Sequence, residues 1–228
     1  YTGALAKSWQ AEAEKMGVKI TLDDLKNYKV AVRKPISFKV FGLNGLTSPP
    51  PSASGLMVAG TLRYLDNYYK THQIPDPVSA KRIIVTAETL LFFQELRNKT
   101  IAEPPFSTLD PQSYYGSAAE KADWKTIDAR IRARLDKIET AVVQSVERVE
   151  ETRLAVQLDP PKGHTAHLSI LDDQGNAVSY TTTIEEWFGS GIVVPNHGFL
   201  LNNELSDFTA EVGHPNSPAA GKRPRSNM

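Results

Sequence analysis

The chain has 228 residues, of which 40% are hydrophobic, and its 26 basic residues balance its 26 acidic residues. This length and composition are sufficient for one folded domain or one large part of a domain. A formal charge of zero offers no general attraction to nucleic acid or to an anionic membrane surface. Cysteine is absent, which excludes disulfides and thiol nucleophiles, and no apolar run is long enough to span a membrane.

The first elements predicted in chain order are two helices. Residues 4–16 form a helix-like run that ends at Gly17, and a short β segment is expected at residues 18–20. Thr21 is a good N-cap for a second helix, because it stands just before that helix and Asp24 lies in the first turn.

Strands and two further helices are predicted over the next eighty residues. Apolar and basic residues alternate over residues 30–46, which predicts an antiparallel strand pair. Three prolines at residues 49–51 favour an extended backbone, and Ser52 is a potential N-cap for an apolar helix at residues 56–69. Residues 76–98 show an apolar stripe at helical spacing.

A long charged helix is predicted from residue 118 to about residue 158, where Pro160-Pro161 ends it. Apolar residues recur along it at steps of three and four: Ile127, Ile131, Leu135, Ile138, Val142, Val146 and Val149. We expect this face to lie on a sheet of the same chain; a coiled-coil partner helix is the alternative. A short linker at residues 162–164 then leads to Thr165.

The segment that follows the linker reads as a β-hairpin. His167, Ser169 and Leu171 alternate with Leu168 and Ile170, turn residues occupy 172–176, and a second β-rich run covers 177–184. Antiparallel pairing about this turn places face to face those residues whose numbers sum to about 348. Thr165 and Thr183 satisfy that sum, so they are predicted to be neighbours.

The threonines belong to a longer set of motifs. In chain order these are Thr165-Ala166-His167, Asp172 to Asn176, Thr181-Thr182-Thr183, Phe188-Gly189-Ser190-Gly191, Gly198 to Glu204, and Asp207-Phe208. In order and spacing they resemble the start of the small subunit of γ-glutamyltranspeptidases. Residues 222–228 are similar to that family's Lys-Arg-Pro-x-Ser-Ser-Met.

The pattern of helices and strands alone predicts a mixed α/β or α+β chain with no cofactor signature. The resemblance sharpens this to α+β, as part of a four-layer αββα N-terminal-nucleophile hydrolase. It implies a precursor that cuts itself between His164 and Thr165. Residues 1–164 would then be the C-terminal part of the large subunit and residues 165–228 the N-terminal part of the small subunit. Thr165 would be the nucleophile, and Thr183 would hold its hydroxyl.

The resemblance also implies how a γ-glutamyl donor is bound. It assigns the donor's α-amine to Asp207, with Glu204 and Glu185 assisting, and the α-carboxylate partly to Ser226 and Asn227. Two positions depart from the family pattern, which usually has Asn in place of Glu185 and a second Ser in place of Asn227. An extra carboxylate strengthens the binding of an amine but repels a nearby carboxylate.

Other parts of the family's machinery are expected outside this chain. The resemblance places the arginine for the donor carboxylate before Tyr1 and the Gly-Gly pair of the oxyanion hole beyond Met228. The chain by itself is therefore expected to be nearly inactive. Residues 209–221 contain no aromatic residue and are too short for the lid that some family members carry, which predicts an open donor groove.

The expected function is transfer or hydrolysis of γ-glutamyl groups from donors such as glutathione, with an amino acid, peptide or water as acceptor. Alternatives are an acylase or a polyglutamate transpeptidase or hydrolase of the same fold, or a non-catalytic binding or structural protein. The five histidines lack the spacing of a metal site, so neither metal nor cofactor is expected. The resemblance implies a periplasmic or secreted protein, with no nucleic-acid partner.

Overall fold

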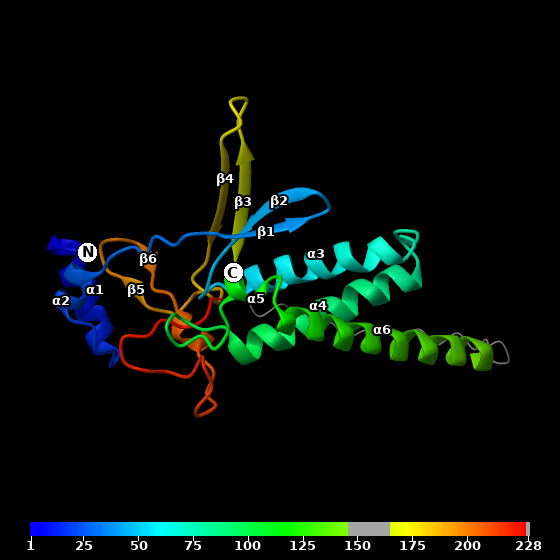
Figure 1. Ribbon diagram of the computed structural model, residues 1–228. Helices are drawn as coiled ribbons and strands as arrows, with labels where there is room; N and C mark the ends of the chain where they lie inside the picture. The colour runs from blue at the N-terminus through cyan, green and yellow to red at the C-terminus, as the bar shows by residue number, and fades with distance from the viewer. Residues whose placement is uncertain (146–164, 227–228) are drawn as a thin grey trace. The chain divides into compact units, whose positions relative to one another are not determined.

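The computed structural model describes residues 1–145 and 165–226, and their helices and strands are shown in Figure 1. The described residues divide into two compact units. The first unit combines residues 1–33 with residues 165–206, and the second combines residues 34–145 with residues 207–226. Both units mix helices with antiparallel strand pairs, as the α+β prediction requires.

The first unit begins with the two predicted helices, α1 (Gly3–Lys15) and α2 (Leu22–Asn27). The N-cap prediction for α2 is confirmed: the Asp24 N–H donates to the Thr21 hydroxyl at 3.0 Å, and the Thr21 N–H donates to the Asp24 carboxylate at 2.8 Å. The β segment expected at residues 18–20 is wrong, because these residues form no strand. The Ile20 N–H instead donates to the carbonyl two residues earlier, at 3.1 Å, which closes a local turn.

A hairpin follows in the first unit, formed by β3 (Ala166–Leu171) and β4 (Ala177–Thr182). Its predicted register is confirmed, because Ala166 pairs with Thr182 and Leu171 pairs with Ala177. Asp172 shapes the turn by accepting the Asn176 N–H at 2.7 Å, and Gly175 adopts a φ of 84° that suits glycine.

The rest of the first unit contains the short strands β5 (Val193–Val194) and β6 (Phe199–Leu200), which pair antiparallel. Helix α1 contacts β5, and Val194 is fully buried. Gly189 must be glycine, since its φ is 53° and an added Cβ would lie 2.2 Å from the carbonyl oxygen of Leu201. The 3₁₀-helix η1 (Glu204–Asp207) comes next, and the boundary between the two units lies within it.

The second unit opens with the strand pair β1 (Ile36–Val40) and β2 (Leu43–Thr47). The predicted pair is therefore present, but residues 30–35 form no strand. Pro35 has no N–H to offer a neighbouring strand, and β1 begins directly after it.

Helices make up most of the second unit. They are α3 (Ser54–Thr71), α4 (Ala80–Thr100), α5 (Pro111–Tyr114) and α6 (Ala118–Ser145). Their core is a cluster of aromatic and aliphatic side chains that includes Tyr64, Phe93 and Ile131. Gly60 allows α3 to approach α4 closely, because an added Cβ would lie 2.4 Å from the ring of Phe93.

Two expectations about these helices are wrong. In its described part the apolar face of α6 contacts α4 and joins a helical core through Ile127 and Ile131, so there it packs on a helix instead of a sheet. Ser52 does not cap α3, whose N-cap is Ala53. The Ser52 hydroxyl, which a cap would use, lies 2.8 Å from the Ser48 hydroxyl, and the residues on either side of Ser52 are bonded to the backbone of Ser226 in a parallel bridge. The predicted continuation of the long helix beyond residue 145 lies outside the described residues.

None of the helices in the described part of the chain is both long enough and apolar enough to cross a membrane.

Candidate active site

Thr165 and Thr183 meet at the end of the hairpin opposite its turn. Thr165 lies just before β3 and Thr183 just after β4, one position beyond the last strand pair. The Thr165 hydroxyl donates to the Thr183 hydroxyl oxygen at 3.2 Å. The structure therefore brings the two threonines together as the register predicts, while their catalytic roles stay predictions.

The Thr183 hydroxyl has a second partner, the N–H of Glu185, which donates to it at 2.8 Å. A hydroxyl oxygen has two acceptor positions, so these two donors together fix how Thr183 faces Thr165. Glu185 makes this bond with a φ of 74°, a left-handed conformation that is uncommon outside glycine. Such conformations concentrate at functional sites, where the surroundings hold them.

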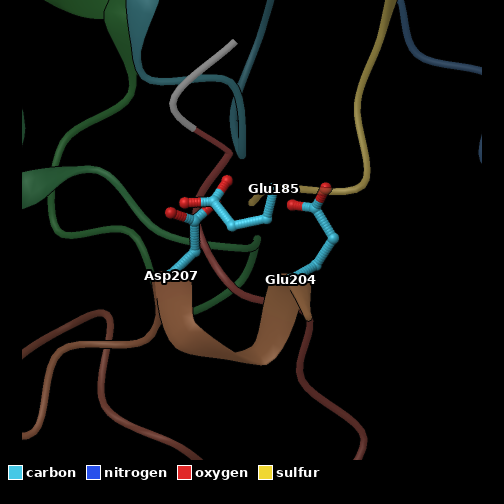
Figure 2. A group of neighbouring side chains, drawn as sticks. All are labelled: Glu185, Glu204 and Asp207. Atoms are coloured by element: carbon cyan, nitrogen blue, oxygen red, sulfur yellow. The ribbon is translucent and has the colours of Figure 1, made fainter. Parts of the chain in front are cut away.

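Glu185 also belongs to a group of three carboxylates with Glu204 and Asp207, whose oxygen atoms all lie within 4.8 Å of one another. Figure 2 shows that Glu204 and Asp207 rise from the two ends of η1 toward Glu185. Because one turn of 3₁₀-helix carries both residues, their separation is set locally. All three side chains are partly buried.

Asn203 holds the segment of Glu185 against the segment that leads into η1. Its N–H donates to the carbonyl of Ile184 at 3.2 Å, and its side-chain oxygen accepts the N–H of Glu186 at 3.1 Å. Asn202 accepts the Glu204 N–H at 3.1 Å and so caps η1. Sequence reasoning assigned no role to these asparagines, although two consecutive amides beside acidic residues were a usable signal.

Three carboxylates this close create a strongly negative position. Oxygen ligands of this kind suit a hard divalent cation, and the same charge suits an ammonium group. The expectation of no metal came from histidine spacing and did not consider these carboxylates, which could hold a cation. The carboxylates also fit the α-amine of an amino-acid substrate.

Ser226 lies in the second unit beside the proline-rich segment. Its N–H donates to the Pro51 carbonyl at 3.0 Å, and its carbonyl accepts the Ala53 N–H at 2.9 Å. The segment at residues 49–51 thus fixes the backbone of Ser226. The predicted site residues His164 and Asn227 lie outside the described residues.

Two arginines that sequence reasoning missed stand close enough to Asp207 to attract it. Burial lowers the pKa of Arg97, and attraction to Asp207 acts in the opposite direction. Burial also lowers the pKa of Arg225, reinforced by the charge of Arg97 and opposed by Asp207. These guanidinium groups offset part of the negative charge within the second unit.

The described residues combine helices with antiparallel strand pairs, and comparison with solved structures identifies the fold to which they belong. A solved structure of the cephalosporin acylase from Bacillus halodurans matches the fold with a TM-score of 0.72 at 22% identity, over 100% of this chain and 37% of that one. The predicted αββα fold is thereby confirmed.

A family model described as gamma-glutamyltranspeptidase matches residues 1–228, and the chain belongs to this family. The glutathione hydrolase proenzyme of Bacillus subtilis (strain 168) is 31% identical over 233 residues, and that of Escherichia coli (strain K12) is 30% identical over 240 residues. Each match covers all of this chain but only 38% of the relative's length. The family resemblance predicted from the motifs is confirmed.

Proposed function

We propose that the complete protein is a self-processing threonine-nucleophile enzyme. It transfers or hydrolyses γ-glutamyl groups from donors such as glutathione, with water, an amino acid or a peptide as acceptor. The observation that carries the proposal is the 3.2 Å contact between Thr165 and Thr183, in a chain of the γ-glutamyltranspeptidase family.

Self-processing uses the Thr165 hydroxyl before that residue has a free amine. Its Oγ attacks the carbonyl carbon of His164, the peptide C–N bond breaks, and an ester forms while the nitrogen becomes the α-amine of Thr165. Water then hydrolyses the ester, which leaves a carboxylate on His164 and restores the hydroxyl. Thr183 supports the step by holding the Thr165 oxygen in place.

Turnover then uses one residue as both nucleophile and base. The freed α-amine has an ordinary pKa of about 8 and can take the proton from Thr165 Oγ. The oxygen attacks the γ-carbonyl of the donor, the C–N bond to the leaving amine breaks, and that amine receives the proton. Water or an acceptor amine attacks the resulting ester and releases the γ-glutamyl group as acid or amide.

Donor recognition is proposed to follow the charges of the site. Glu185, Glu204 and Asp207 would bind the donor's α-amine, because their carboxylates lie within 4.8 Å of one another. Ser226 and Asn227 would bind part of the α-carboxylate. A neutral acyl donor gives the carboxylates nothing to bind, so the site favours a γ-glutamyl donor over the substrate of a neutral-acyl acylase.

A γ-linked polyglutamate remains the second candidate donor. Its terminal residue carries the same α-amine, and residues 209–221 do not supply an aromatic lid. The segment is braced internally, since Lys222, directly after it, donates to the carbonyl of Ser217 at 2.7 Å, and Asn216 within it is fully buried. Family membership also supports a periplasmic or secreted location, testable by fractionation of cells that make the full-length protein.

Processing provides the direct test. Mass spectrometry of the full-length protein should show two subunits, the smaller one beginning at Thr165, together with release of a chromophore from a γ-glutamyl anilide. Thr165→Ala should abolish both the cut and the turnover, because it removes the attacking oxygen. Thr182→Ala is the matched control, since Thr182 pairs with Ala166 on the opposite face of the hairpin. A Thr165→Ala protein that still yields both subunits would rule out the mechanism.

A further inference from the structure

Asn216 is a fully buried polar residue in the loop that connects η1 to the C-terminal segment. Its side-chain nitrogen donates to the carbonyl of Asp207 at 2.8 Å and to the Thr209 hydroxyl at 3.3 Å. Its side-chain oxygen accepts the N–H of Arg225 at 2.7 Å. One amide thus joins the end of η1 to the residue immediately before Ser226.

The two segments that Asn216 joins carry the two halves of the proposed donor site. Asp207 is assigned to the donor's α-amine, and Ser226 to its α-carboxylate. The Ser226 end is further fixed by its bonds to Pro51 and Ala53, while at the Asp207 end Asn216 bonds directly to the Asp207 carbonyl. All of these residues belong to the second unit, which makes the connection internal to one compact body.

The amine and the carboxylate of a γ-glutamyl donor are attached to the same carbon atom. The groups that bind them must therefore be held at one separation, and a misplacement of about 1 Å can cost about 10²-fold in rate. A buried amide with both of its ends bonded is suited to fixing such a separation, because an unpaired donor or acceptor at this depth is costly.

We propose that Asn216 is a positioning residue that sets the distance between Asp207 and Ser226 and so lets the site recognise both groups of the donor at once. The inference rests on the proposed function. Asn216 also stabilises its own loop, because its N–H donates to His214 at 3.0 Å and its carbonyl accepts the Thr209 N–H at 3.0 Å. An experiment must separate the two roles.

The test compares three γ-linked donors on the full-length enzyme: one with both α-groups, one with the amine acetylated, and one that lacks the α-carboxylate. Asn216→Asp keeps the oxygen that accepts the Arg225 N–H but places a second oxygen against the Asp207 carbonyl. Asn216→Ala removes both the side-chain donor and the side-chain acceptor. We expect kcat/KM for the complete donor to fall about 10- to 100-fold, mainly through KM, and that for each single-group donor to fall less than about threefold.

The matched control is Ser107→Ala. Ser107 closes another loop of the same unit, since its hydroxyl accepts the Ala102 N–H at 2.9 Å and donates to the Ala102 carbonyl at 2.7 Å. It should change thermal stability without any selectivity among the three donors. Equal losses on all three donors in the Asn216 variants, or no loss on the complete donor, would overturn the inference. A wild-type protein that neither cuts itself nor releases γ-glutamyl groups would instead overturn the proposed function.

Discussion

Asp207→Asn should weaken catalysis with donors that carry a free α-amine. The change removes one of three negative charges while it keeps the shape of the side chain and one hydrogen-bond acceptor. A carboxylate about 4 Å from an ammonium group is worth about 4 kcal/mol at an effective dielectric constant of about 20. The carboxylates of Glu185 and Glu204, which lie within 4.8 Å of the Asp207 carboxylate, remain and retain part of the attraction for the ammonium group.

We therefore expect a loss of about 2–3 kcal/mol, in the lower part of the 2–5 kcal/mol range for truncating a buried charge pair. This corresponds to about a 30- to 150-fold fall in kcat/KM, at about 1.4 kcal/mol for each factor of ten. The assay is steady-state release of chromophore from a γ-glutamyl anilide and from its N-acetylated form by the full-length enzyme.

The N-acetylated donor has no ammonium group, so its much lower kcat/KM should change less than threefold on this reasoning. Asp173→Asn is the matched control, because it removes the same charge from the exposed turn of the hairpin. Equal losses with the two donors would refute the assignment of Asp207 to the amine.

Two further predictions concern the fold and access to the site. Glu120→Ala should lower the free energy of unfolding, measured by urea denaturation, by about 3–5 kcal/mol. The Glu120 carboxylate is nearly fully buried and accepts two hydrogen bonds from Arg63, at 2.7 and 2.8 Å. The control is Glu95→Ala, which breaks an exposed ion pair with Arg130 and should lower the free energy of unfolding by no more than about 1 kcal/mol. If the donor groove is open, the full-length enzyme should release glutamate from a long γ-linked polyglutamate as well as from a γ-glutamyl tripeptide. A polyglutamate that neither reacts nor competes with the tripeptide would contradict the open groove.

The parts of the fold that the sequence predicts are those controlled by neighbouring residues. Thr21 and Asp24 form their reciprocal cap within one helical turn, and the Asp172 turn fixes the register that brings Thr165 to Thr183. The same local reasoning failed at Ser52, because α3 begins one residue later with Ala53 as its N-cap, the Ser52 hydroxyl pairs with that of Ser48, and the backbone around Ser52 is bridged to Ser226, which is distant in sequence.

The arrangement of the carboxylates could not be derived from residue spacing. The approach of Glu185 to Glu204 depends on its left-handed backbone and on the bonds of Asn203, and neither leaves a periodic pattern in the sequence. Their assignment to one site came from the family motifs. Arg225, which is buried, and Arg97, which is partly buried, were missed because long basic side chains are normally expected to be exposed.

The hairpin that carries Thr165 exposes large apolar side chains from both of its strands, among them Leu168, Ile170 and Tyr180. It forms a two-stranded sheet in the described residues, and an isolated hairpin of this kind is marginally stable in water. Its strands therefore need to pack against further structure before they can hold Thr165 in one geometry. In the proposed mechanism, self-cleavage would then act as a checkpoint on assembly: the precursor would acquire its nucleophile only after the hairpin has been covered, and the fraction of uncut chain would report how much of a preparation had not completed folding.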